Sequence, residues 1–203
     1  MRFSIIIPAH NAEHRIGQMI NNINDQTFTD YEIIVVANSC EDNTANMCRR
    51  WNRCEVIEIN GRNPGAARNA GLEAAKGEWI LFADDDDHWF NPYALEQIDE
   101  ELKIIGDQVD MIQCAFYWKG IGVTATSNGR IWPNVWSKVI RREAIGDTRF
   151  PEDGMDDDLV FTNAMLAKRI RIMCLPLLWY YYDYMRPGSV TWTISGGKCD
   201  SRG

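Results

Sequence analysis

Short apolar runs alternate with amphipathic segments along the first 90 residues of the chain. The apolar runs are rich in β-branched residues, which is typical of buried strands, and the segments between them repeat apolar residues at helical spacing. This pattern predicts strands at 3–9, 31–38, 54–59 and 78–83, and helices at 11–25, at 42–52 and from Pro64 to a stop at Gly77. Fully apolar strands separated by helices indicate a parallel sheet covered on both faces.

The alternation becomes less regular after residue 90. The pattern there predicts helices at 91–105 and 157–169 and strands at 109–118, 135–141, 170–175 and 177–184. It also predicts a loop or hairpin tip at 119–130 and a flexible tail at 195–203. No internal repeat or low-complexity linker divides the chain. We therefore expect a single α/β domain over residues 1–203, with a more mixed second half.

Composition narrows the classes of protein to which the chain can belong. The net charge of −8 argues against a general nucleic-acid-binding protein, and no apolar segment reaches the length of a membrane span. None of the six cysteines forms a C-x-x-C pair, so we expect reduced thiols rather than a zinc or disulfide framework. The G-x-G-x-x-G and P-loop patterns are absent, which removes support for those nucleotide sites.

Four consecutive aspartates, Asp84 to Asp87, follow the apolar run at 78–83. One interpretation is a solvated acidic loop before the next helix. An EF-hand calcium loop is rejected, because it needs glycine and glutamate where this chain has Trp89 and Leu95. The third interpretation is a site for Mg²⁺ or Mn²⁺, because ligands bind at the carboxyl ends of strands in open α/β sheets. Alternate residues of an extended segment face the same way, so Asp84 and Asp86 can bind one cation together.

Four longer segments of the chain form an ordered set of motifs. They are SIIIPAHNAE, EIIVVANSCEDNT, NPGAARNAGLEAAKGEWILFADDDD, and VWSKVIRRE followed by RFPEDGMDDDLVF. Together they resemble the motifs of the family 2 glycosyltransferases, from residue 3 to residue 191. The resemblance implies a GT-A-type, Rossmann-like α/β fold with a mainly parallel central sheet and helices on both faces. The resemblance also implies two halves of the domain: a nucleotide-sugar-binding half at 1–90 and an acceptor-side half at 91–194.

The resemblance assigns the aspartates to a D-x-D-D motif, in which Asp84, Asp86 and Asp87 contact Mn²⁺ or Mg²⁺ and Asp85 is dispensable. It implies a larger donor-binding set: Pro8, Asn11, Asn38, Arg68, Asp84, Asp86 and Arg186. Asn38 stands where the family usually has a base-recognising aspartate. Its amide oxygen can still accept a hydrogen bond from a uracil N–H, so a UDP-sugar is the expected donor. Arg68 has two open roles, contact with the diphosphate or a structural ion pair with the aspartates.

The second acidic segment, at 153–161, aligns with the family's E-D motif. The resemblance implies that Asp158 is the general base for the acceptor hydroxyl, with Asp157 beside it. The first turn of a helix favours an ionised carboxylate, and simple capping of that helix is the alternative role. Trp136 and Lys138 match a W-x-K motif and are expected to form the acceptor-side wall.

The resemblance thus implies an inverting transfer of sugar from a nucleotide sugar to a saccharide or lipid-linked saccharide, in bacterial-type surface polysaccharide synthesis. It places the protein in the cytoplasm, leaves peripheral contact with the inner membrane face open, and suggests no nucleic-acid partner. A nucleotidyltransferase is disfavoured because its glycine- and lysine-rich triphosphate loop is absent. A degenerate nucleotide-sugar-binding protein without transferase activity stays open, because Ala37 and Asn38 replace the usual acidic pair.

Overall fold

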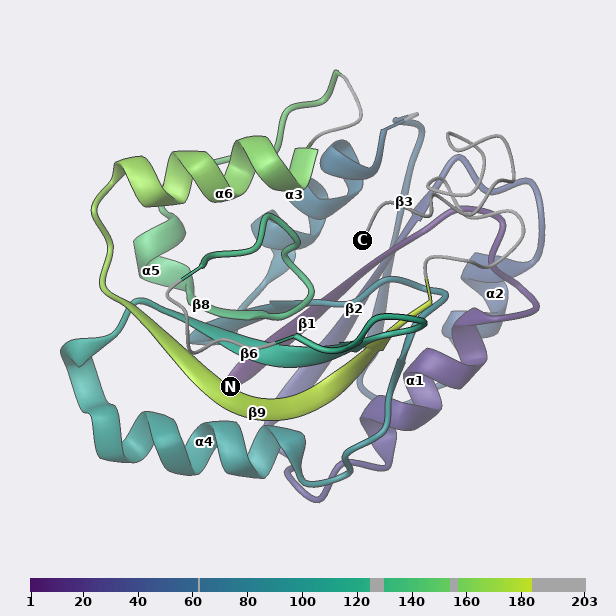
Figure 1. Ribbon diagram of the computed structural model, residues 1–203. Coiled ribbons are helices and arrows are strands. Elements are labelled where there is room, and N and C mark those ends of the chain that lie inside the picture. Colours follow the sequence, from purple (N-terminus) through teal and green to yellow (C-terminus); the bar gives the residue numbers. More distant parts are fainter. Residues whose placement is uncertain (62, 125–129, 154–156, 184–203) are drawn as a thin grey trace.

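The computed structural model describes residues 1–61, 63–124, 130–153 and 157–183. Within these ranges, nine strands form one curled sheet with helices on both faces (Figure 1). The strands are β1 (Phe3–Ala9), β2 (Tyr31–Asn38), β3 (Cys54–Ile59), β4 (Trp79–Phe82), β5 (His88–Trp89), β6 (Met111–Trp118), β7 (Gly122–Val123), β8 (Lys138–Arg141) and β9 (Ile172–Tyr182). The helices are α1 (Ile16–Asn24), α2 (Thr44–Cys48), α3 (Pro64–Ala74), α4 (Ala94–Ile105), α5 (Arg142–Ile145) and α6 (Asp157–Ala167), with a 3₁₀ turn at Gly106–Gln108.

The strand order is β3-β2-β1-β4-β8-β6-β9-β5, with β7 paired to β6. Strands β1 to β4 run parallel, with Ile5 opposite both Ile33 and Leu81. The remaining strands pair antiparallel, except β6 with β9. The predicted α/β architecture, with a parallel first half and a mixed second half, is confirmed.

Alternation along β1 divides the interior into two layers. Ile5 and Ile7 face the core shared with α1, α2 and α4, whereas Ile6 faces the core shared with α3, α5 and α6. Both layers are buried because successive side chains of a strand point to opposite faces. The central strands β1 and β2 are therefore mostly apolar, and their polar residues Ser4, Glu32 and Asn38 lie close to the strand ends.

Helix α3 begins at Pro64, as the sequence predicts, but ends at Ala74 before the predicted stop at Gly77. The Asn63 side chain accepts a hydrogen bond from the Gly65 N–H at 2.5 Å, and Pro64 occupies the first helical position. Gly71 lies directly on β1, where an added Cβ would come within 2.4 Å of Ile6 Cγ2. This close approach sets the depth of α3 on the sheet, and with it the position of Arg68.

Several predicted boundaries are wrong. The helix predicted at 42–52 is only α2 (Thr44–Cys48), because the chain turns back towards β3 through Arg53, at a φ of +63°. The helix predicted at 91–105 begins later because Asn91 Oδ1 accepts a hydrogen bond from the Tyr93 N–H and closes a turn there. The strand predicted at 135–141 begins at Lys138.

The end of the described chain also differs from its prediction. The two strands predicted at 170–175 and 177–184 are replaced by the single strand β9 (Ile172–Tyr182), whose register on β6 shifts near Pro176, a residue without an N–H for the ladder. The two-residue strand β5 was not predicted. The tail predicted at 195–203 lies outside the described residues. Among the described helices, none has both the length and the apolar character needed to span a membrane.

Candidate active site

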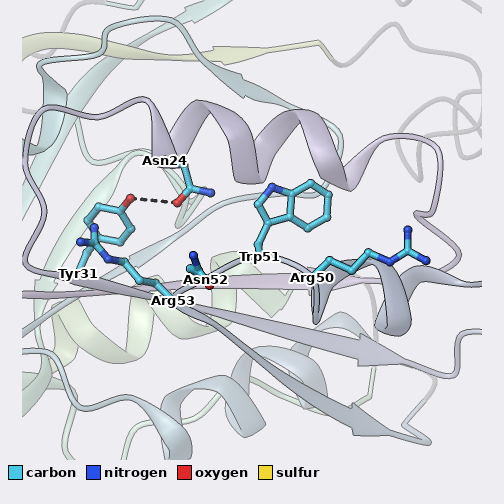
Figure 2. A pocket seen from close by; sticks show the side chains of 6 residues that line it. All are labelled: Asn24, Tyr31, Arg50, Trp51, Asn52 and Arg53. Atoms are coloured by element: carbon cyan, nitrogen blue, oxygen red, sulfur yellow. Dashed lines mark hydrogen bonds between the residues drawn. The ribbon is translucent and has the colours of Figure 1, made fainter.

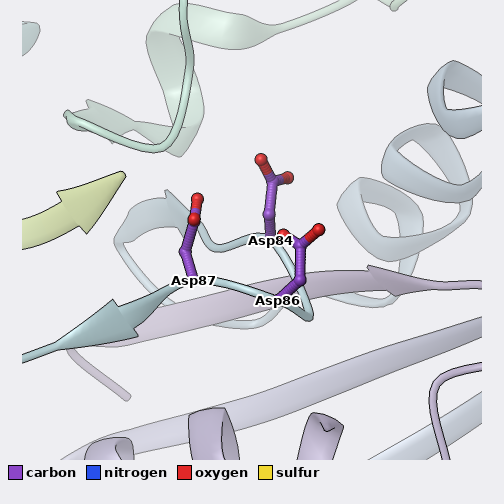
Figure 3. Close-up of side chains that lie close together, drawn as sticks. All are labelled: Asp84, Asp86 and Asp87. Atoms are coloured by element: carbon purple, nitrogen blue, oxygen red, sulfur yellow. The ribbon is translucent and has the colours of Figure 1, made fainter. Parts of the chain in front are cut away.

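The acidic loop follows β4 at the carboxyl ends of the parallel strands. Asp84, Asp86 and Asp87 point to the same side of this loop (Figure 3), and each offers a carboxylate oxygen within 4.8 Å of the others. Hard carboxylate oxygens suit Mg²⁺ and Mn²⁺, and three of them leave coordination positions open for other oxygens. The residues present therefore fit a divalent cation.

Crowding and burial strain the ionised form of this cluster. Burial, followed by the charges of Asp86 and Asp158, raises the pKa of Asp84 to about 7 against the opposing effect of Arg68. Burial and the neighbouring aspartates likewise raise the pKa of Asp87 well above its usual range. A positive counter-charge at the cluster would relieve both penalties.

Tyr180 on β9 holds the acidic loop in place. Its fully buried hydroxyl accepts a hydrogen bond from the Asp84 N–H at 3.0 Å and donates one to Asp87 Oδ2 at 3.0 Å. The Asp183 N–H donates to the other oxygen of Asp87 at 3.2 Å. The sequence does not reveal this role of Tyr180, because nothing in the aromatic run at 179–182 singles out one hydroxyl.

Asp85 lies outside the cluster of three carboxylates and makes an ion pair with Arg15. It is 8% exposed and pairs with Arg15 through two contacts, Nε to Oδ1 at 2.8 Å and Nη2 to Oδ2 at 3.0 Å. Arg15 also donates to the carbonyl oxygens of His10 and Asn11. Asp85 therefore ties the acidic loop to the turn after β1, a link that sequence spacing does not reveal.

Arg68 joins the two acidic segments of the sequence. Its Nη1 lies 2.5 Å from Asp157 Oδ2, while Nη2 lies 3.3 Å from Asp84 Oδ1 and 3.5 Å from Asp158 Oδ1. The side chain is 7% exposed, and the surrounding carboxylates raise its pKa despite burial. The structural ion pair considered for Arg68 is thus present, whereas its contact with a diphosphate stays a prediction.

The two aspartates at the start of α6 have different surroundings. Asp157 Oδ1 accepts the N–H of Asp158 at 3.0 Å, and its other oxygen pairs with Arg68. Asp158 Oδ2 accepts the Val135 N–H at 3.1 Å. Asp158 Oδ1 is shielded from solvent and makes no hydrogen bond to any described residue. Asp158 therefore keeps one oxygen that makes no hydrogen bond and lies 3.5 Å from Arg68 Nη2, while Asp157 is committed to Arg68 and the helix start.

The two residues predicted for the acceptor side are both buried, Trp136 with 5% of its surface exposed and Lys138 with none. Trp136 stacks on Tyr180 and Tyr182, with ring centroids 4.5 and 4.9 Å apart, next to the acidic loop. Lys138 is fully buried and donates to the carbonyl oxygens of Trp132 and Asn134. Burial lowers the pKa of Lys138 to about 7. Lys138 therefore cannot line an acceptor-side wall as predicted, and lies behind it.

The residues predicted to bind the nucleoside lie at the carboxyl ends of β1 and β2. Pro8 lies opposite Val36 in the parallel β1–β2 ladder. Asn11 has a φ of +46°, and its Oδ1 accepts a hydrogen bond from the Glu41 N–H. Asn38 is 7% exposed and its amide donates to Asn63 O at 2.9 Å. The structure thus brings these three residues to the edge that carries the acidic loop, whereas Arg186 lies outside the described residues.

A shallow pocket of about 400 Å³ lies far from this site, at the amino ends of β2 and β3 (Figure 2). It is lined by Asn24, Tyr31, Arg50, Trp51, Asn52 and Arg53. The Tyr31 hydroxyl donates to Asn24 Oδ1 at 3.2 Å, and the Arg53 guanidinium lies 5.5 Å from the Tyr31 ring centre. Since ligands of open α/β sheets bind at the carboxyl ends of the strands, this pocket is separate from the candidate active site.

Two known proteins are similar to this chain in sequence. The poly(ribitol-phosphate) β-N-acetylglucosaminyltransferase TarS of Staphylococcus aureus is 29% identical over 93% of this chain and 36% of its own length. The putative glycosyltransferase EpsH of Bacillus subtilis is 28% identical over 88% of this chain and 60% of its own length. The chain thus spans between about a third and three fifths of the length of these relatives.

Solved structures and a family profile agree with this similarity. The structure of S. aureus TarS 1-349 in complex with UDP-GlcNAc superposes with a TM-score of 0.78 at 25% identity, covering 94% of this chain and 60% of that one. The mannosyltransferase PcManGT from Pyrobaculum calidifontis, in complex with GDP-Man and Mn²⁺, superposes with a TM-score of 0.74 at 21% identity. The match covers 95% of this chain and 60% of that one, and at this identity it shows only that the two share the GT-A fold. The profile of glycosyl transferase family 2 matches residues 4–156, so the chain belongs to this family.

Proposed function

We propose that this chain transfers a sugar from a nucleoside-diphosphate sugar to an acceptor hydroxyl, with inversion at the anomeric carbon and assistance from a divalent cation. The observation that carries the proposal is the bridge made by Arg68 between Asp84 of the acidic loop and the aspartates of α6. Inversion needs a single displacement, with a base on the side opposite the departing diphosphate. The bridge provides a cation-binding group and a candidate base at its two ends.

The roles proposed for the residues follow from their contacts. Asp84, Asp86 and Asp87 would hold Mn²⁺ or Mg²⁺, which when bound supplies positive charge for the departing diphosphate. Asp158 accepts the proton of the acceptor hydroxyl while that oxygen bonds to the anomeric carbon. The Val135 N–H fixes one oxygen of Asp158, and Arg68 Nη2 lies 3.5 Å from the other oxygen.

The proposed donor is a UDP-sugar that lies over Pro8, Asn11 and Asn38, with Arg186 at the diphosphate. The likeness to the UDP-GlcNAc complex of TarS supports this choice. The proposed acceptor is a saccharide or lipid-linked saccharide of a bacterial surface polysaccharide, and the names of the related enzymes support it. Trp136 is the proposed acceptor-side residue, and the proposed setting is the cytoplasm, with peripheral contact with the inner membrane face left open.

The proposal is tested in two steps. A thermal-shift panel of UDP- and GDP-sugars, with and without Mn²⁺, should identify a donor that stabilises the protein, and NMR of the product should then show an inverted anomeric centre. Asp86→Ala should lose the metal-dependent stabilisation by the donor. Asp158→Asn should keep it but lose transfer.

Asp107→Asn is the matched control, because Asp107 is 98% exposed and outside the network. If Asp158→Asn transferred sugar at the wild-type rate, Asp158 would not be the general base. Donor binding by the wild type without transfer or donor hydrolysis would instead identify a degenerate nucleotide-sugar-binding protein.

A further inference from the structure

Lys138, the first residue of β8, carries a fully buried ammonium group. Its Nζ donates to Trp132 O at 2.5 Å and to Asn134 O. Among the described residues, no carboxylate lies within ion-pair distance of Nζ, and Asp158 is the acidic group with the largest electrostatic effect on it. Burial of a charge without a paired carboxylate costs free energy, so a lysine at this position calls for a compensating role.

The carbonyls that Lys138 binds belong to residues 130–135, a segment without helix or strand. Other side chains hold the same segment at neighbouring points. The buried Gln113 donates to Arg130 O at 2.9 Å and accepts the Trp132 N–H at 2.7 Å. The hydroxyl of Thr162 on α6 donates to Pro133 O at 2.7 Å. Side-chain donors thus bind four carbonyls of the segment in place of a regular backbone ladder.

The next amide after these fixed carbonyls points at the candidate base. The Val135 N–H donates to Asp158 Oδ2 at 3.1 Å, one residue beyond the Asn134 carbonyl that Lys138 holds. Rotation of the peptide plane between residues 134 and 135 would move this N–H and its carbonyl together, because the peptide unit is planar. An ammonium group bound to the carbonyl oxygen therefore fixes the direction of the N–H on the other side of that plane.

We propose that Lys138 is a positioning residue for the transfer reaction, which acts on Asp158 through the Asn134–Val135 peptide. The proposal rests on the proposed function, because it takes Asp158 to be the base. A lysine suits this role, since its compact ammonium donates to two carbonyls at once, which methionine of similar length cannot do. With the peptide fixed, the Asp158 carboxylate keeps one donor and one orientation.

The test compares Lys138→Met with a matched control, Lys168→Met. Lys168 on the segment after α6 also donates its ammonium to two backbone carbonyls, those of Ala144 and Ile145, but away from Asp158. Lys138→Met should lower kcat for transfer roughly 10- to 100-fold, as expected when a supporting contact of a reacting group is lost. Stabilisation by the UDP-sugar and Mn²⁺ should be unchanged, and Lys168→Met should match the wild type.

A pH profile separates positioning from a general packing defect. The acidic limb of kcat in Lys138→Met should move to higher pH, because the Lys138 charge that interacts with Asp158 is removed and the Val135 N–H is no longer held towards the carboxylate. Thr162→Val removes the neighbouring hydrogen-bond donor to Pro133 O. This variant should lower kcat and raise the pH of the acidic limb, both by less than Lys138→Met does. It replaces Lys138→Met in the test if that variant does not fold. The proposal is overturned if a folded Lys138→Met variant has the kcat and the acidic pH limb of the wild type. If Lys138→Met does not fold, the same result for Thr162→Val overturns it.

Asp158→Asn is measured in parallel. An inactive Asp158→Asn beside a wild-type-like Lys138→Met refutes only the role of Lys138, whereas an active Asp158→Asn refutes the base itself. A drop in kcat for Lys138→Met with an unmoved pH limb and weakened donor stabilisation would show a packing role and also overturn the proposal.

Discussion

Replacement of Arg68 by methionine tests the bridge on which the proposed function depends. Met has a similar length but carries no charge, so Asp84, Asp157 and Asp158 would lose their shared partner. Removal of one partner from a buried ion pair costs about 3–5 kcal/mol. Asp157 is 11% exposed, but Asp84 and Asp158 are 30% and 23% exposed, so solvent screens part of the loss.

We therefore expect the free energy of unfolding to fall by about 3 kcal/mol, the lower end of that range. For a chain of this size the corresponding fall in melting temperature is roughly 6–12 °C. Urea denaturation followed by circular dichroism measures the loss. Arg49→Met is the control, because Arg49 pairs with Glu58 on the surface and its loss should cost less than about 1 kcal/mol.

The loss should also depend on pH. Arg68 lowers the pKa of both Asp84 and Asp157, against burial, so its removal raises both values further. A carboxyl group whose pKa is higher in the folded state contributes stability below its unfolded pKa of about 4 and loses it as pH rises through the folded value. The difference between wild type and Arg68→Met should thus be small near pH 4 and grow towards pH 8. A loss no larger than that of Arg49→Met, or one independent of pH, would refute the reasoning.

Three further predictions concern the surroundings of the site. Mn²⁺ affinity, measured by calorimetry, should fall as pH drops through about 7, because burial raises the pKa of Asp84 to about that value and protons then compete with the cation; equal affinity at pH 6 and 8 would contradict this. Asp85→Ala should cost about 1–2 kcal/mol in urea denaturation, because Arg15 loses both contacts, and unchanged stability would make Asp85 dispensable after all. Gly77→Ala should cost about 1–3 kcal/mol in the same assay, because its Cβ would lie 2.5 Å from the backbone nitrogen of Ser4; a neutral result would show that β1 yields at this point.

Local patterns in the sequence determined the order of strands and helices. The apolar runs of β1, β2 and β4 identify buried strands because both faces of each are covered, and Asn63 with Pro64 marks the start of α3 because capping depends on adjacent residues alone. The same patterns predicted that both acidic segments flank regular elements. Short elements such as β5 escaped prediction, because two residues show no periodicity and pair only with a distant partner.

Only the tertiary structure decided which side chains of the site meet. Arg68 and Asp157 are 89 positions apart, and Tyr180 and Asp87 are 93 apart, so their contacts depend on the strand order and on the depth of α3. Lys138 illustrates the limit, because its motif predicted an exposed acceptor wall and the fold buried its ammonium among carbonyls. The sequence by itself thus determined where β1, β2 and β3 begin and end, through local hydrophobic preferences. The packing of distant elements determined which of their charges neutralise one another, because that depends on distances that no local pattern encodes.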